Sequence, residues 1–181
     1  MLISCDQLMQ RMFPGGCGEH HALLAARARH YLFSMARQCA DAGVAPVIDF
    51  GFWTPAMRQE AIDALSGYEL DWRYLDISDD EWNRRIAGRN AAIQAGRADP
   101  SDYFVDEGLK QKVLQLFIPP TAEELPGLTN ISQKCPQQKG PGPFRIPALF
   151  VYVCCCGSEI TSGCRAAWWS DQLRKRPFAA R

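Results

Sequence analysis

The stretch from Pro46 to Trp53, Pro-Val-Ile-Asp-Phe-Gly-Phe-Trp, constrains the fold most strongly. An apolar run ends there in one carboxylate, Asp49, and Thr54-Pro55 follows with the residue types of a helix N-cap and first helical position. A run without polar alternation indicates a strand buried on both faces, as in parallel sheets covered by helices. Such sheets carry their chemistry at the carboxyl ends of strands, so Asp49 is the first candidate functional residue.

Helical and strand patterns alternate on both sides of this stretch. Apolar residues recur at helical spacing, and Gly43 and Gly67 supply stops. We expect helices over 19–42, 56–65 and 106–117, a further helix that begins after the capping box at Ser78, and strands over 44–50 and 70–77. This alternation predicts an α/β fold with a largely parallel sheet.

Length and charge divide the chain unevenly. A chain of 181 residues is expected to form one domain, with room for a tail. The net charge of zero is made of −6 over residues 1–133 (12 Lys and Arg, 18 Asp and Glu) and +6 over residues 134–181 (8 and 2). The start, Met-Leu-Ile-Ser-Cys-Asp, lacks the apolar core of a signal peptide, and no stretch is long enough to span a membrane. We therefore expect a cytoplasmic protein with reduced cysteines and no membrane partner.

Two carboxylates and a group of arginines are the candidate catalytic residues. Asp6 and Asp49 each follow an apolar segment, so both are expected at one edge of the sheet, where paired carboxylates suit phosphoryl transfer. The alternative is that each is a turn residue or helix cap. Arg85 and Arg89 share a helical face and would suit phosphate, although Glu81 lies at the right spacing to pair with Arg85.

Four pieces of the chain together resemble a known family. They are Ile-Ser-Cys-Asp-Gln-Leu-Met at 3–9, Val-Ile-Asp-Phe-Gly-Phe-Trp at 47–53 with Arg58, Tyr-Leu-Asp at 74–76 followed by the arginines of 84–89 and Asn90, and Phe117 to Leu125. In order and spacing this chain is similar to the P-loop kinase-like ATPases (AAA-type ATP-binding proteins), whose relatives include zeta toxins, chloramphenicol phosphotransferase and shikimate- or gluconate-kinase-type enzymes. The resemblance covers residues 3–125, about two thirds of the chain.

The resemblance implies a function, its cofactors and roles for named residues. It implies transfer of the ATP γ-phosphate to a small-molecule hydroxyl acceptor, with Mg²⁺ and without nucleic acid. Asp6 would be the general base, and Asp49 would lie near the acceptor and the metal. The other expected site residues are Arg85 and Arg89 for catalysis in a lid, Arg84, Arg89 and Asn90 at ATP, and Phe52, Trp53 and Arg58 at the acceptor. The alternative to the acceptor pocket is that the aromatic residues belong to the core.

One part of the family pattern is missing from these 181 residues. The family's first strand and its Gly-x-x-x-x-Gly-Lys-Ser/Thr loop precede the segment that resembles Ile3-Ser4, and no such loop occurs in the sequence. We therefore expect a three-layer α/β/α P-loop-type sheet that is incomplete: a truncated domain over 1–126, with a lid at 84–105, that is inactive. The family's first strand is central, and the apolar run 148–156 is expected either to fill its place or to extend the far side of the sheet.

The basic, Cys- and Pro-rich tail over 127–181 resembles nothing that we can name. One interpretation is an altered reading frame near residue 130. The alternatives are a zinc site from Cys135, Cys154–Cys156 and Cys164, or a nucleic-acid contact through Arg174–Arg176. The Cys-x-x-Cys spacing of structural zinc sites is absent, so we assign no metal ligands. For the whole chain, the alternative to a kinase-like enzyme is a non-catalytic remnant or a protein-interaction module.

Overall fold

The computed structural model describes residues 1–99, 102–132 and 148–154. Its elements in chain order are β1 (Leu2–Ser4), α1 (Cys5–Met12), the short 3₁₀ helix η1 (Gly18–His20), α2 (His21–Asp41), β2 (Val47–Asp49), α3 (Pro55–Ala64), β3 (Glu69–Asp76), α4 (Asp79–Gln94), α5 (Glu107–Leu116), β4 (Thr129–Ser132) and β5 (Ala148–Cys154). The α/β class and most predicted elements are confirmed, whereas α1, η1 and β4 were not predicted.

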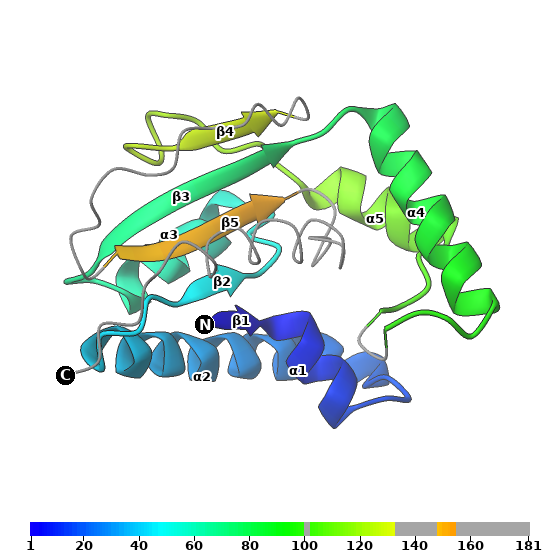
Figure 1. The fold of residues 1–181 in the computed structure, drawn as a ribbon, viewed down its shortest axis with the longest axis horizontal. Helices are drawn as coiled ribbons and strands as arrows, with labels where there is room; N and C mark the ends of the chain where they lie inside the picture. Colours follow the sequence, from blue (N-terminus) through cyan, green and yellow to red (C-terminus); the bar gives the residue numbers. More distant parts are fainter. Residues whose placement is uncertain (100–101, 133–147, 155–181) are drawn as a thin grey trace, which may run out of the picture.

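The strands of the described residues form one parallel sheet in the order β1-β2-β5-β3-β4 (Figure 1). Ser4 of β1 is in register with Asp49 of β2, so the two strands end together. The strand predicted over 44–50 is shorter in the structure, where β2 covers only Val47–Asp49, and the strand predicted over 70–77 is shifted by one residue, to Glu69–Asp76. The parallel sheet is confirmed, and the full three-layer arrangement stays a prediction.

The last strand in the sequence lies in the middle of the sheet. β5 pairs in parallel with β2 on one side and with β3 on the other. The hypothesis that the run beginning at residue 148 fills the central position is therefore confirmed, and its extension of the far side is wrong. The boundary between a domain at 1–126 and a tail at 127–181 stays a prediction, but β4 and β5 both join the sheet of the expected domain.

Local sequence signals account for the helices that position the site. Thr54 caps α3 by accepting a hydrogen bond from the Met57 amide, and Pro55 opens the helix.

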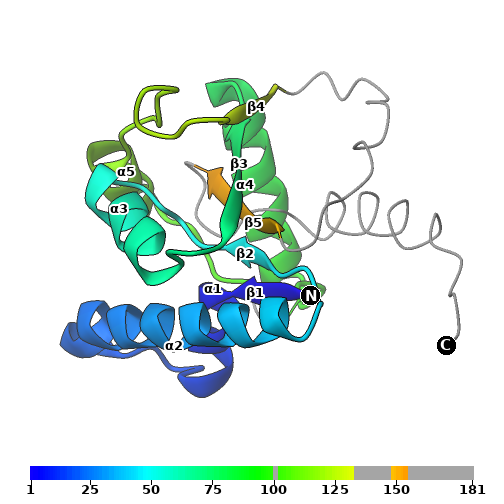
Figure 2. The same ribbon diagram turned by 90° about the vertical axis from the view of Figure 1, so that its left-hand side faces the viewer.

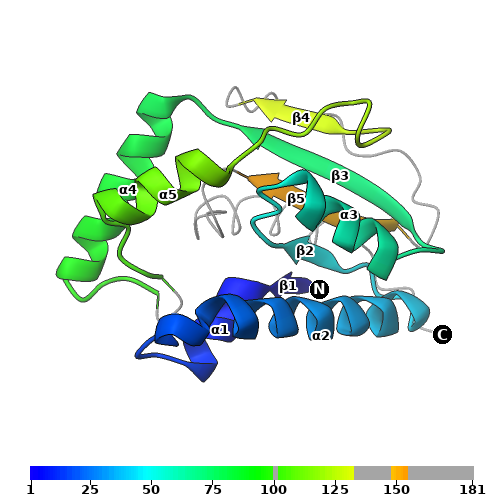
Figure 3. The same cartoon turned by 180° about the vertical axis from the view of Figure 1, so that it is seen from behind.

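Helices α2 to α5 have clear positions relative to the sheet. Helix α3 lies behind the sheet in Figure 1 and in front of it in Figure 3, and α2 runs beneath the β1 side. Helices α4 and α5 lie together beyond the carboxyl end of β3, as Figures 1 and 3 agree. The carboxyl edge is therefore bordered by helices.

An aromatic cluster forms the centre of the core between the sheet, α2 and α3. Phe33 of α2 packs against Phe50 and Phe52, with ring centroids 5.4 and 6.5 Å away, and Phe52 meets Trp72 of β3 edge-on at 5.7 Å. All four residues are buried. The edge-on view in Figure 2 shows α2 and α3 on the same side of β2 and β3, between which these rings lie.

Within the part of the chain that the structure describes, no helix is both long and apolar enough to cross a membrane.

Two aromatic residues of α2 give a matched test of this core. Phe33 is 2% exposed, whereas Tyr31, on the same helix, is 62% exposed. Phe33→Ala is expected to lower the free energy of unfolding by about 3–5 kcal/mol, because it leaves a cavity in the cluster. Tyr31→Ala should change it by no more than about 0.5 kcal/mol. Urea denaturation of both variants measures the difference, and equal effects would contradict this packing.

Candidate functional site

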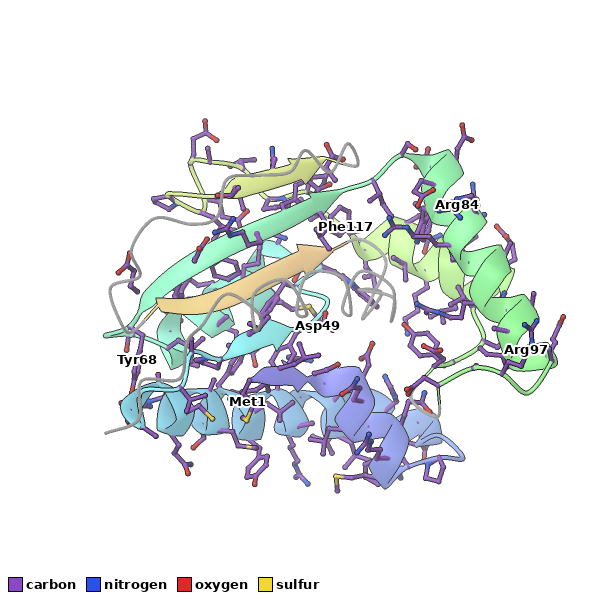
Figure 4. All side chains as sticks on the ribbon, in the orientation of Figure 1. Met1, Asp49, Tyr68, Arg84, Arg97 and Phe117 are labelled. Carbon is purple, nitrogen blue, oxygen red and sulfur yellow. The ribbon has the colours of Figure 1, made fainter. Side chains whose placement is uncertain are left out.

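The carboxyl ends of β1 and β2 bring the two predicted carboxylates to one edge. Asp49 is the last residue of β2 and is 3% exposed, and Asp6 lies in the first turn of α1, two residues after the end of β1. Ser4, the last residue of β1, is the register partner of Asp49. Its side chain caps α1 by accepting a hydrogen bond from the Gln7 amide. Figure 4 shows Asp49 at the end of β2, on the side of the sheet that faces α4 and its Arg84.

The loop after Asp49 turns sharply into α3. Phe52 has a φ of 44°, a left-handed conformation that is unfavourable for a bulky side chain. A Cβ atom on Gly51 would lie against the indole of Trp53, 2.8 Å from its Cε2, so glycine leaves the space that this ring occupies. Phe50 and Phe52 both belong to the buried core cluster, and the predicted contact of Phe52 and Trp53 with an acceptor stays a prediction. Trp53 alone of the aromatic group remains half-buried at the edge.

Arg58 of α3 is buried, and its side chain holds the loop after Asp49 in place through hydrogen bonds. Its Nε and Nη2 donate to both carboxylate oxygens of Glu124, at 2.7 and 2.9 Å, and Nη1 donates to the carbonyl oxygens of Phe52 and Ile118, at 2.9 and 3.0 Å. The side chain is 0% exposed. An acceptor could reach the guanidinium only if Glu124 moved away. In this structure Arg58 therefore holds the loop and Glu124 together, and its predicted contact with an acceptor stays a prediction.

The chain segment after α5 contacts the loop after Asp49 as well as Arg58. The Ile118 amide donates to the Trp53 carbonyl oxygen at 2.8 Å, and Leu125 is fully buried in the core cluster. Glu124 was not predicted as a functional residue, although it lies in the Phe117–Leu125 piece that carries the resemblance. Because its partner is 66 residues away, periodicity could not reveal the pair. The result is a clasp of Arg58 and Glu124 that joins the Asp49 loop to the end of α5.

The predicted lid arginines lie on α4, where a carboxylate holds two of them. Glu81 accepts from Arg84 Nε and Nη2, at 2.7 and 2.6 Å, and from Arg85 Nε at 2.6 Å. Arg84 remains mostly exposed, whereas Arg85 is largely covered. The pairing of Glu81 with Arg85 that helical spacing indicated is therefore present. In this arrangement, phosphate would compete with Glu81 for both guanidinium groups.

Arg89 and Asn90 lie further along α4, at its contact with the 102–106 segment. The Arg89 guanidinium lies 5.6 Å from the centre of the Tyr103 ring, which suits a cation–π contact, and only 9% of Arg89 is exposed. The Asn90 side chain donates to the Val105 carbonyl at 2.8 Å and accepts from its amide at 3.0 Å. Asn90 thus fastens this segment to α4, and its predicted contact with ATP stays a prediction.

Comparisons with known proteins place this architecture in a family. Residues 1–104 match a protein family described as an AAA domain, which covers more than half of the chain. The chain belongs to this family. Comparisons with curated proteins and with solved structures found no match. Membership in the AAA domain family supports a P-loop NTPase-like, nucleotide-binding and kinase-like domain, and families of this type generally bind their nucleotide with Mg²⁺.

The residues of the site meet only part of what Mg²⁺ and ATP require. Asp6 and Asp49 are oxygen donors of the kind that Mg²⁺ prefers. The phosphates of a nucleotide need a row of backbone N–H groups with a lysine, and the sequence contains no Gly-x-x-x-x-Gly-Lys. In the described ranges, no three His, Cys, Asp or Glu side chains form a metal-binding group. The zinc set from Cys135, Cys154–Cys156 and Cys164 and the basic Arg174–Arg176 lie largely or wholly outside these ranges. The described residues therefore offer two carboxylates for a metal, and the 181-residue sequence offers no Gly-x-x-x-x-Gly-Lys loop for the phosphates.

The clasp can be tested by removing either partner. Arg58→Leu or Glu124→Gln is expected to lower the free energy of unfolding by about 3–5 kcal/mol. The first change leaves Glu124 and the Phe52 and Ile118 carbonyl groups without their donor, and the second leaves the buried Arg58 charge without a countercharge. Arg84→Leu is the control, since this exposed arginine should contribute no more than about 1 kcal/mol. Thermal and urea unfolding of the three variants measure these effects. A loss for Arg58→Leu no larger than that for Arg84→Leu would contradict the role of the clasp.

The Glu81 carboxylate gives a prediction on pH. Hydrogen bonds from Arg84 and Arg85 lower the pKa of Glu81 from its usual 4.5 to about 2. The pKa of Glu81 is lower in the folded chain than in the unfolded chain. Its ionised carboxylate therefore stabilises the folded state above pH 4.5, and this contribution is lost as the pH falls towards 2. A carboxyl-selective NMR titration should show this shifted pKa in the native chain. In an Arg84→Ala, Arg85→Ala double variant the pKa should return towards 4.5, and a normal pKa in the native chain would contradict the arrangement.

Proposed function

We propose that this chain is a kinase-like domain whose carboxyl edge binds a hydroxyl-bearing small molecule as phosphate acceptor. The observation that carries the proposal is the shared edge of β1 and β2, where Ser4 and Asp49 are in register and Asp6 follows in the next turn. Membership in the AAA domain family supports the same class of chemistry.

Each carboxylate has a distinct role in this proposal. Asp6 is half-buried at the start of α1, so an acceptor hydroxyl can approach it, and its carboxylate accepts the hydroxyl proton. Asp49 is nearly covered, and it orients the acceptor through a charge-assisted hydrogen bond. Trp53, half-buried at the same edge, offers part of an apolar wall beside them.

Arginines from α4 would supply positive charge on the far side of the edge. Arg85 and Arg89 are one turn apart on this helix, and arginine forks match the geometry of phosphate oxygens. As the chain stands, we propose that it binds Mg-ATP weakly or not at all and does not turn over, since its sequence lacks the phosphate-binding loop.

A thermal-shift screen of the 181-residue chain tests this function. A panel of sugars, nucleosides and amino alcohols should include ligands that raise the melting temperature saturably, and a ligand at 100 times its Kd stabilises by about 2.7 kcal/mol. Asp49→Asn and Asp6→Asn should lose this shift. Asp63→Asn should retain it, because this exposed carboxylate lies near the end of α3 that is remote from the edge.

Four outcomes would contradict the proposal: two concern the acceptor site and two concern the expected weak ATP binding and inactivity. If no acceptor shifts the native chain, or if Asp49→Asn responds as the native chain does, the edge is not an acceptor site. A saturable shift with Mg-ATP, or measurable transfer of the γ-phosphate, would contradict the expected inactivity and would show that other elements of the chain bind the phosphates.

A further inference from the structure

The strand β5 occupies a place that the rest of the sheet leaves open. Its Val151 is in register with Ile48 of β2 on one side and with Trp72 of β3 on the other, and all three side chains are buried. β2 and β3 each hydrogen-bond to β5 and not to each other. Without β5, both would present an inner edge of unpaired backbone groups, separated by the width of one strand.

We call the gap between β2 and β3 the slot. The position of β5 in the chain allows this strand to leave the slot while β1 stays paired with β2 and β3 stays paired with β4. Residues 1–132 build both flanks, since β1 neighbours β2 and β3 neighbours β4. β5 follows β4, which lies at an edge of the sheet, after the fifteen residues 133–147. Such a connection spans at most about 50 Å. That length suffices to pass from the β4 edge to the slot, and it also suffices to reach a slot in a neighbouring molecule.

A second copy of this chain is the partner that fits the slot. It carries the same strand, so its residues 148–154 can adopt the same parallel register with β2 and β3. From this topology we propose that two copies exchange β5 reciprocally, each filling the slot of the other. Exchange of an identical element needs no new interface, because every contact of the closed monomer is remade between the copies. The short connection favours the closed monomer at low concentration.

Exchange requires β5 to leave its own slot, which sets the design of the test. The full chain is brought to mild urea at a series of concentrations and returned to buffer, and its mass is measured by size-exclusion chromatography with light scattering. The ratio of dimer to monomer should rise in proportion to the concentration of monomer, about tenfold for a tenfold rise. The dimer should persist after dilution, because its dissociation also requires β5 to unpair.

Val151→Pro separates strand exchange from other kinds of association. Proline lacks the N–H that a central strand must donate, so this β5 should fill neither slot, and no persistent dimer should form. A synthetic peptide of residues 148–154, flanked by lysines, should raise the melting temperature of this variant saturably. The same peptide with proline at its fourth position should not. This peptide arm applies even if the variant is poorly folded alone.

Two results would contradict the exchange of β5 between copies. A chain that stays monomeric through the urea series, with no effect of the peptide on Val151→Pro, would show that the slot accepts β5 only within its own molecule. A dimer that forms equally well in Val151→Pro would show that the copies associate through a different surface. Either result would overturn strand exchange.

Discussion

The sheet is continuous only because β5 satisfies the backbone of both central neighbours. Buried N–H and C=O groups need partners, and β2 and β3 obtain theirs from a strand that the chain supplies last. Everything placed at the carboxyl edge depends on this pairing, since it fixes the distance between the Asp49 end of β2 and the α4 end of β3. The candidate site is therefore built on contacts between the last described strand and two strands from the first half of the chain.

The clasp of Arg58 and Glu124 adds the second level of order. Strand pairing positions Asp49 itself, but the loop behind it is fixed by the carbonyl contacts of Arg58 and by the Ile118 amide. An ion pair inside a protein is seldom a large net stabiliser against an apolar replacement, and its value lies more in allowing one arrangement. Here that arrangement ties the predicted acceptor side of the edge to the helices that carry the predicted lid.

The features that the sequence predicted are those with local causes. The apolar run before Asp49, the Thr54-Pro55 helix start and the cap at Ser78 are each legible within a few residues, and the structure contains all three. β4 is short and α1 follows β1 without a break, so neither has a pattern long enough to detect. The inward course of Arg58 and the burial of Phe52 depend on partners far along the chain. A positive charge and an aromatic ring beside a strand end do not reveal that direction.

The backbone at Phe52 has a consequence for motion at the edge. Its left-handed conformation costs about 1–3 kcal/mol relative to an ordinary one, and the aromatic cluster and the Arg58 contact hold it there. If Glu124 withdrew from Arg58, this peptide could relax, and the relaxation would offset part of the free energy of breaking the ion pair. The loop from Gly51 to Trp53 is thus held in an unfavourable backbone conformation by contacts with Arg58 and the aromatic cluster. A displacement of the segment after α5 would be transmitted to the neighbourhood of Asp49 while the sheet remained still.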